Sequence, residues 1–326
     1  TLGKIDIQGP DAGEFLNLLY SNGFKTLQVG KARYGLMLRE DGILYDDGTA
    51  SRLTTDRYLM TTTTHNAAGV LAHMEFYHQC VWPGLDVQFC SVTEQWAGLA
   101  VAGPRSRELL SRVLPQILLD NDAFPYMAAG EFVFEGMPLR LFRISFSGEL
   151  GYEINVPAGY ARAFADHLMD VGEAFDITPY GSEALDVMRI EKAYHAWGSD
   201  FGTEYTMFDA GLERFVSFDK ADFVGGAAAR RQREAPSEWC FAGFVVASVD
   251  ADPLPSSPIF KADALAGFVT SGAMGFRVKK RLALGYIKRE FAAAGNDFEI
   301  EILGVRCPAE RTTTPFYDRG NDRVRM

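Results

Sequence analysis

Long apolar runs and paired cysteines are both missing from this chain of 326 residues. No stretch of about 18 consecutive apolar residues occurs, so no membrane-spanning helix is expected, and no secretory signal opens the chain. The four cysteines (Cys80, Cys90, Cys240 and Cys307) include no C-x-x-C pair. In a chain of this length we expect free thiols in a reducing compartment, and we predict a cytoplasmic location without a membrane partner.

Positive charge and histidine are also scarce. The net charge is −11, which argues against a nucleic-acid partner, because such a partner favours a basic face. The five histidines include no H-E-x-x-H motif, and His73 and His78 have the wrong spacing for two ligands on one helix face. We therefore expect no metal site.

Three common sequence motifs of nucleotide-binding and hydrolytic enzymes are absent as well. There is no G-x-x-x-x-G-K-[ST] loop, no G-x-G-x-x-G turn after a strand and no G-x-S-x-G elbow. The sequence therefore predicts neither a phosphate-binding loop nor a bound dinucleotide. The chain also lacks an initiator methionine and opens within a strand-like segment, from which we expect residues upstream of Thr1 in a larger protein.

The composition that is present is typical of soluble globular proteins. Apolar residues make up 47% of the chain and charged residues 23%, and the length suggests two or three cores. A strand, a Gly-Pro pair and an amphipathic helix occur in IDIQGPDAGEFLNLL and again 94 residues later in LAVAGPRSRELLSRV. This repeat predicts two α+β subdomains of similar design.

The pattern changes near Pro236, where we predict a domain boundary. Beyond it, CFAGFVVAS, LAGFVTSG, LALGYIKRE and DFEIEILG are short strands separated by Gly, Pro and Asp, and no long helix is expected. This pattern is typical of a small all-β domain and favours a barrel. The predicted fold class is α+β, with two α+β subdomains in residues 1–235 and a C-terminal β-barrel in residues 236–326.

Acidic residues inside expected strands are the candidates for chemistry. Asp46 and Asp47 follow the apolar segment GILY, and Glu153 lies between Tyr152 and Ile154. Strand alternation places Glu153 on the opposite face from its two neighbours. A solvent-facing strand position would explain Glu153, and a turn around Asp47 would explain the aspartate pair. Alternatively, one carboxylate matches a heterocycle with adjacent ring N–H and exocyclic NH₂ donors, such as a pterin or guanine edge.

Six segments of the chain together resemble one family. In chain order they are YGLMLREDGILYDDG, WAGLAVAGPRSRELL, ISFSGELGYEINVP, SEALDVMRIEKAYHAWGSD, DAGLERFVSFDKADFVG and GFVTSGAMGFRVKKRLALGYIKRE. Over nearly the whole chain they resemble the aminomethyltransferase family, the tetrahydrofolate-binding T-protein of the glycine cleavage system and its relatives. Within that family, the chain looks most like the folate-binding C-terminal portion of sarcosine oxidase alpha subunits and dimethylglycine dehydrogenases.

The resemblance implies a fold and a site. Two α+β subdomains and a C-terminal barrel would surround a central folate pocket. Glu153 matches the strand glutamate that hydrogen-bonds the pterin edge in the family. Asp46 matches most closely the catalytic aspartate near the reacting folate nitrogens, with Asp47 as the alternative one residue away. The other folate-binding positions implied by the resemblance are Tyr34, Phe146, Tyr152, Arg189 and Arg214.

The resemblance also implies a reaction, tetrahydrofolate-dependent one-carbon transfer. Folate would capture a methylene unit, as formaldehyde or an iminium, from an N-methyl amine such as sarcosine or dimethylglycine and become 5,10-methylenetetrahydrofolate. The oxidation that supplies this unit would need a flavin domain on missing residues or a flavoprotein partner chain. Two alternatives stay open, a redox-neutral demethylase that transfers a methyl group to folate and a non-catalytic folate-binding scaffold.

Overall fold

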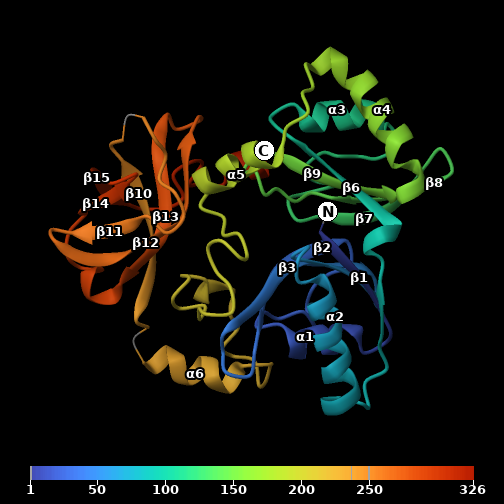
Figure 1. The fold of residues 1–326 in the computed structure, drawn as a ribbon. Helices are drawn as coiled ribbons and strands as arrows, with labels where there is room; N and C mark the ends of the chain where they lie inside the picture. The colour runs from blue at the N-terminus through green and yellow to red at the C-terminus, as the bar shows by residue number, and fades with distance from the viewer. Residues whose placement is uncertain (1, 236, 249) are drawn as a thin grey trace.

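Three parts meet around the centre of the molecule in the computed structural model, which describes residues 2–235, 237–248 and 250–326 (Figure 1). Two parts combine an antiparallel sheet with helices, and the third is a closed barrel. The predicted fold class is thereby confirmed. The predicted boundary at Pro236 lies outside the described residues, and the first barrel strand begins at Trp239.

The first subdomain is an antiparallel sheet with two helices on its outer face (Figure 1). Its strands, in the spatial order β2-β3-β4-β1-β5, are β1 (Gly3–Gln8), β2 (Lys31–Leu38), β3 (Leu44–Thr54), β4 (Arg57–Thr62) and β5 (Gln88–Ser91). The helices are α1 (Ala12–Leu19) and α2 (Ala67–Phe76), the latter followed by a π-helical turn, Tyr77–Val81. Met37, Ala50 and Met60 face these helices and pack with them into one apolar core.

The second subdomain repeats this layering with a smaller sheet. Its strands, in the spatial order β6-β9-β8-β7, are β6 (Trp96–Ala102), β7 (Ala129–Phe134), β8 (Met137–Phe142) and β9 (Gly151–Pro157). Helices α3 (Ser106–Val113) and α4 (Ala161–Gly172) cover its outer face, so that the two sheets face each other (Figure 1). Tyr152 and Ile154 of β9 point into the core under these helices, which directs Glu153 toward the first sheet.

The repeat that the sequence predicts is present in both subdomains. Strand β1 leads through Gly9 into α1, and β6 leads through Gly103 into α3. Both glycines have a left-handed backbone, with φ of 139° and 127°. A Cβ atom on Gly9 would lie 2.2 Å from the carbonyl oxygen of Asp86, so only glycine fits at this turn.

The C-terminal part is a closed barrel with an apolar interior that includes Phe244, Ile259, Ala283 and Ile300. Its strands, in the spatial order β10-β13-β12-β11-β14-β15, are β10 (Trp239–Val246), β11 (Pro258–Lys261), β12 (Ala264–Gly275), β13 (Lys280–Lys288), β14 (Asp297–Ile302) and β15 (Val305–Thr312). A last short helix, α7 (Asp322–Arg325), brings the chain end back to the second subdomain (Figure 1).

A long connecting segment, residues 182–235, joins the second subdomain to the barrel. It contains α5 (Ser182–Glu191) and α6 (Gly226–Glu234) and passes between the barrel and the first sheet (Figure 1). Its residues Trp197, Tyr205 and Phe215 pack against a buried apolar cluster that includes leucines of β2 and β3. The segment therefore forms part of the space that the two sheets leave between them.

Candidate functional site

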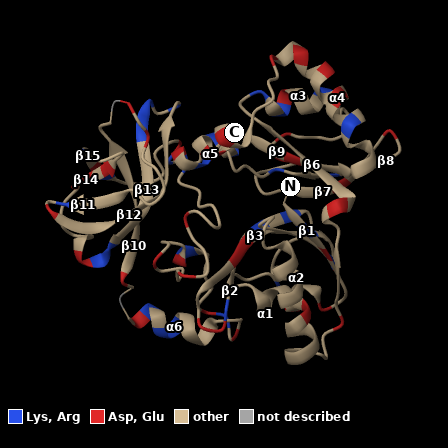
Figure 2. Cartoon of the chain, in the orientation of Figure 1, with Lys and Arg blue, Asp and Glu red and all other residues tan. Residues whose placement is uncertain are grey.

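A cavity of about 1260 Å³ lies between the two sheets and the connecting segment. Strands β1 to β4, β6, β8 and β9 contribute to its walls, together with residues 193–197 and 212–217. All of its lining residues lie between 2 and 217, so no described residue of the barrel reaches it. Figure 2 shows an acidic stretch (red) in β3 near the centre of the molecule.

Asp47 is the carboxylate of β3 that opens into this cavity. The hydroxyl of Tyr34, on the neighbouring strand β2, donates a hydrogen bond of 2.7 Å to its Oδ2. Burial raises the pKa of Asp47 to about 6, and this hydrogen bond limits the rise. At neutral pH the cavity therefore contains a carboxylate that is mainly ionised and held in place by one hydroxyl.

Asp46 points to the opposite face of β3 and does not line the cavity. It lies directly across from Met37, on the side of the sheet that the helices cover, and has no solvent exposure. The amide of Thr63 donates to its Oδ2 (3.2 Å), while Oδ1 has no hydrogen-bond partner. Burial first, and then the charge of Asp47, raise the pKa of Asp46 to about 7.

Glu153 opens into the same cavity from β9, on the wall formed by the second sheet. Burial raises its pKa to about 7, and the nearby Lys4 ammonium on β1 limits the rise. No hydrogen bond joins its carboxylate to another residue in the described part of the chain. Because a half-buried carboxylate with free acceptor positions is costly, Glu153 is suited to accept hydrogen bonds from a bound ligand.

Aromatic rings and one guanidinium extend the site away from the carboxylates. Phe146 stacks with Tyr194 at a centroid distance of 6.2 Å, and both line the cavity. The guanidinium of Arg214 lies 4.8 Å from the ring of Phe215, also at the cavity wall. Tyr152 contributes to the lining, but its side chain is buried in the core of the second sheet. A planar ligand could thus stack between rings with an anionic end near Arg214.

Comparison with known proteins identifies the family. Residues 1–220 match the model described as the GCVT N-terminal domain, and residues 240–318 match the glycine cleavage T-protein C-terminal barrel domain. The chain belongs to the glycine cleavage T-protein family. The family predicted from the sequence is thereby confirmed, and the chain carries both domains of an aminomethyltransferase-type enzyme.

Relatives of this T-protein-like chain include enzymes of different length. It is 43% identical over its whole length to a sarcosine oxidase alpha subunit of Rhizobium meliloti and covers 34% of that subunit. It is 30% identical to dimethylglycine dehydrogenase of Mus musculus, covering 99% of the chain and 37% of the relative. It is 31% identical to an aminomethyltransferase of Streptomyces coelicolor, covering 98% of the chain and 85% of the relative. The chain thus spans about a third of the oxidase and dehydrogenase relatives.

A solved structure of the same family supports the fold. The crystal structure of glycine cleavage system aminomethyltransferase T from Bartonella henselae superposes with a TM-score of 0.87. The superposition covers 97% of this chain and 84% of that protein at 25% sequence identity. The arrangement of two α+β subdomains and a barrel is therefore that of a T-protein.

Of the eight site residues that the T-protein resemblance implies, the structure brings six to the cavity: Tyr34, Asp47, Phe146, Tyr152, Glu153 and Arg214. Asp46 is directed away by strand alternation, so the one-residue alternative at Asp47 takes the cavity position. Arg189 does not line the cavity either. Its guanidinium is buried against Asp200 and also binds Asp186 at 2.7 Å, which makes it part of the junction with the barrel.

Several cavity residues of this T-protein family member had no signal in the sequence. Tyr126, Tyr180 and Tyr194 lie in loops or at a helix end, where no periodicity indicates the direction of a side chain. Lys4 could have been suspected, since it alternates with the apolar residues of a strand that is almost wholly buried and is itself only 2% exposed. A charged residue on the buried face of a strand usually has a specific counterpart, here the electrostatic partner Glu153.

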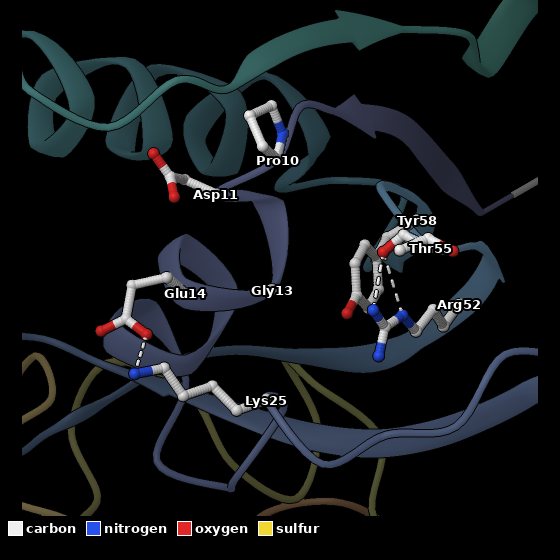
Figure 3. Close-up of a pocket in the computed structure, with 8 residues that line it drawn as sticks. All are labelled: Pro10, Asp11, Gly13, Glu14, Lys25, Arg52, Thr55 and Tyr58. Carbon is white, nitrogen blue, oxygen red and sulfur yellow. Dashed lines mark hydrogen bonds and ion pairs between the residues drawn. The ribbon is translucent and has the colours of Figure 1, made fainter.

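A second hollow, of about 480 Å³, lies beside α1 and is less suited to a ligand (Figure 3). Its charged groups already have partners. Lys25 pairs with Glu14, and Arg52 donates to the carbonyl oxygens of Thr55 (2.7 Å) and Leu27 (2.8 Å). Because these charges are neutralised or bonded within the chain, the cavity between the sheets is the better candidate site.

Neither a metal cluster nor a spanning helix is found in the described ranges. No group of three or more His, Cys, Asp or Glu side chains among residues 2–235, 237–248 and 250–326 could hold a metal ion. Within these residues, no helix is long and apolar enough to cross a membrane. All four cysteines are free thiols.

Proposed function

We propose that the cavity binds tetrahydrofolate and that the chain transfers a one-carbon unit to it, giving 5,10-methylenetetrahydrofolate. One observation carries the proposal: two half-buried carboxylates, Asp47 and Glu153, open into one cavity from facing sheets, and Glu153 accepts no hydrogen bond from a described residue. The family relationship supports folate as the acceptor of the one-carbon unit. The cavity volume of about 1260 Å³ exceeds the usual few hundred Å³ of a small-ligand site, so folate and a small carbon donor fit together.

Glu153 is proposed to bind the pterin ring. The pterin edge presents a ring N–H and an exocyclic NH₂ group side by side, and one carboxylate accepts from both. These donors stabilise the ionised form, so binding should lower the pKa of Glu153 from its raised value of about 7. Phe146, Tyr194 and Arg214 then fit the remainder of the folate, with the rings against its aromatic portion and the guanidinium near a tail carboxylate.

Asp47 is proposed to act at the reacting nitrogens. Folate N5 attacks the carbon of formaldehyde or of an iminium, and N10 then displaces water or the amine to close the five-membered ring. These steps form two C–N bonds and break the N–H bonds at N5 and N10. A displaced oxygen takes up both protons as water, whereas a displaced amine takes up one of them and leaves one proton for a base. An ionised Asp47, held by Tyr34, stabilises the positive charge that develops on nitrogen and accepts this proton. The cavity walls contribute by holding both reactants in attack geometry.

The carbon donor is proposed to be an N-methyl amine that has been oxidised to an iminium. Sarcosine and dimethylglycine fit this description, and they are named in the relatives sarcosine oxidase and dimethylglycine dehydrogenase. The chain spans 34% of that oxidase subunit, so we place the flavin-dependent oxidation on another domain or a flavoprotein partner. A location in the cytoplasm is proposed on the basis of the four free thiols.

Tetrahydrofolate binding and product formation test this function directly. We expect calorimetry to show one bound tetrahydrofolate with and without chelator, and mass spectrometry to find 5,10-methylenetetrahydrofolate after addition of formaldehyde, above the uncatalysed rate. A methyltetrahydrofolate product from a methyl donor would indicate the redox-neutral demethylase instead. Tight binding without turnover would indicate a scaffold, and absence of binding in both conditions would refute the proposal.

Replacing Glu153 by glutamine is expected to weaken tetrahydrofolate binding by about tenfold to a hundredfold. The substitution turns two charge-assisted hydrogen bonds into at most one neutral acceptor contact, at a cost of roughly 1.5–3 kcal/mol. Because the pKa of Glu153 is about 7, wild-type affinity should also fall by about tenfold between pH 8 and pH 6, and this dependence should vanish in Glu153→Gln. Titration calorimetry at both pH values measures this.

The matched control for this substitution is Glu135→Gln, an exposed glutamate in the turn between β7 and β8 of the same sheet. It should leave affinity and its pH dependence unchanged. If Glu153→Gln binds tetrahydrofolate as tightly as the wild type at pH 8, the carboxylate does not hold the pterin edge.

A further inference from the structure

The two consecutive aspartates of β3 lie in very different surroundings. Asp47 opens into the cavity and accepts a hydrogen bond of 2.7 Å from Tyr34. Asp46 is fully buried on the other face, and its Oδ1 has no hydrogen-bond partner. Only Asp47 therefore has both a strong donor and access to solvent that can stabilise a negative charge.

The groups packed around Asp46 offer polar contacts but no positive charge. The amide of Thr63, just before α2, donates a hydrogen bond to its Oδ2, and the polar side chain of Asn66 lies nearby. Three tyrosines interact with it electrostatically: Tyr20, which follows α1 and has a buried hydroxyl without a partner, Tyr34 on β2, and Tyr45 on its own strand. None of the described groups that act on Asp46 is a cation.

Two negative charges on adjacent residues in this setting are strongly disfavoured. Among the described residues, no Lys or Arg acts on Asp46 to neutralise a second charge, and Asp46 is removed from bulk water. The two carboxyl groups therefore share one negative charge, because ionisation of one of them raises the pKa of the other. The better-solvated member, Asp47, then carries the charge, and the other keeps its proton.

We propose that Asp46 is a positioning residue that stays protonated while Asp47 is ionised and thereby holds the pair at a single negative charge. This inference rests on the proposed function for its role in transfer, although the charge state itself can be measured without folate. Asp46 touches neither the cavity nor a reacting atom, and it acts through the charge of Asp47.

This arrangement predicts titration in two macroscopic steps. The first proton leaves the pair near pH 6, mainly from Asp47, and the second near pH 7 or above, mainly from Asp46. Once Asp46 ionises, its charge makes Asp47 a stronger base. The proton affinity of the group in the cavity is thus set in part by a residue on the far side of the sheet.

Asp46→Asn tests the charge state by its effect on stability. The pKa of Asp46 is raised in the folded state from 3.8 to about 7, so the folded protein binds more protons than the unfolded chain between these values. Stability from this group is complete below about pH 4 and is lost as the pH rises toward 7. Relative to Asp46→Asn, the unfolding constant of the wild type should therefore increase by about tenfold or more between pH 5 and pH 8.

Urea denaturation at several pH values measures this ratio. Asp56→Asn is the matched control, because Asp56 is exposed and lies between β3 and β4 of the same sheet. The control should follow the wild type at every pH. A ratio for Asp46→Asn that stays constant from pH 5 to pH 8 would overturn the proposal, because Asp46 would then be ionised throughout.

The pH profile of single-turnover transfer tests the coupling to Asp47. The wild type should change rate in two steps, near pH 6 and near pH 7, whereas Asp46→Asn should keep only the lower step. Identical profiles, or a loss of about a hundredfold at every pH as expected of a catalytic carboxylate, would each overturn the positioning role.

A direct titration keeps the proposal testable if Asp46→Asn does not fold. In wild-type protein labelled with ¹³C at aspartate carboxyl groups, NMR should show two coupled resonances that shift between pH 5 and pH 8. The resonance that disappears in Asp47→Asn belongs to the residue in the cavity, and the remaining one reports Asp46. A titration of that second resonance near pH 4 would overturn the proposal. If transfer fails while both resonances titrate as expected, the proposed function is wrong and the charge sharing stands.

Discussion

Asp47→Asn is expected to slow one-carbon transfer by about a hundredfold or more while tetrahydrofolate affinity changes by no more than a few-fold. Asparagine has nearly the same shape and keeps an oxygen that accepts the 2.7 Å hydrogen bond from Tyr34, so the cavity wall is preserved. The substitution removes only the negative charge, which is proposed to stabilise the positive charge that develops on the reacting folate nitrogen. A charge that matters mainly in the transition state affects the rate rather than the binding.

Single-turnover transfer from formaldehyde, with the uncatalysed rate subtracted, measures this effect, and calorimetry measures binding on the same samples. Asp56→Asn, which removes an exposed charge from the same sheet, is the control and should transfer at the wild-type rate. If Asp47→Asn also transferred at that rate, Asp47 would be only a strand residue of the cavity wall. If affinity fell as much as the rate, Asp47 would be a binding group like Glu153.

Arg189→Met is expected to lower the free energy of unfolding by about 3–5 kcal/mol. The guanidinium is buried and pairs with Asp200, which has no exposure, and it also donates to Ser271 of β12 at 2.8 Å. Methionine fills a similar volume but leaves Asp200 as a buried charge without its cation. The cost is large because that charge cannot reach water.

Denaturant unfolding measures this loss of stability. Two further variants show whether it comes from the uncompensated charge of Asp200. Arg162→Met removes one member of an exposed ion pair with Asp166 and should change stability by less than about 0.5 kcal/mol. Adding Asp200→Asn to Arg189→Met removes the uncompensated charge and should restore part of the loss. A loss below about 1 kcal/mol for Arg189→Met would mean that the buried pair contributes little to the junction.

The architecture could be predicted because its signals are local. Alternation in β9 placed Glu153 opposite Tyr152 and Ile154, and the pleat of a strand enforces that pattern once one face is buried. The recurrence of strand, Gly-Pro and helix likewise indicated two similar subdomains, since a turn such as that at Gly9 tolerates only glycine. Periodicity and turn chemistry act within a few residues, and a single sequence contains them.

The details of the site depend on strand pairing and on contacts between residues that are far apart in the sequence. Asp46 and Asp47 are consecutive, so a shift of one residue in the hairpin exchanges which carboxylate opens into the cavity, and only the pairing of β2 with β3 decides it. The partner of Arg189 lies 11 residues along the chain, and the groups that complete the junction lie more than 80 residues away on β12. Contacts between residues this far apart cannot be predicted from the local pattern of the sequence.

The separation of the barrel from the cavity has a consequence for local unfolding. No described residue of the barrel lines the cavity, yet the Thr270 and Ser271 hydroxyls donate to Asp200 at 2.6 and 2.7 Å, and Asp200 also accepts from the amide of Ala196 at the cavity. Opening the barrel would therefore release the segment around Ala196 while the two sheets stay folded. Amide hydrogens of that segment should exchange together with those of β12 as one cooperative unit, and a bound ligand should slow the exchange of both.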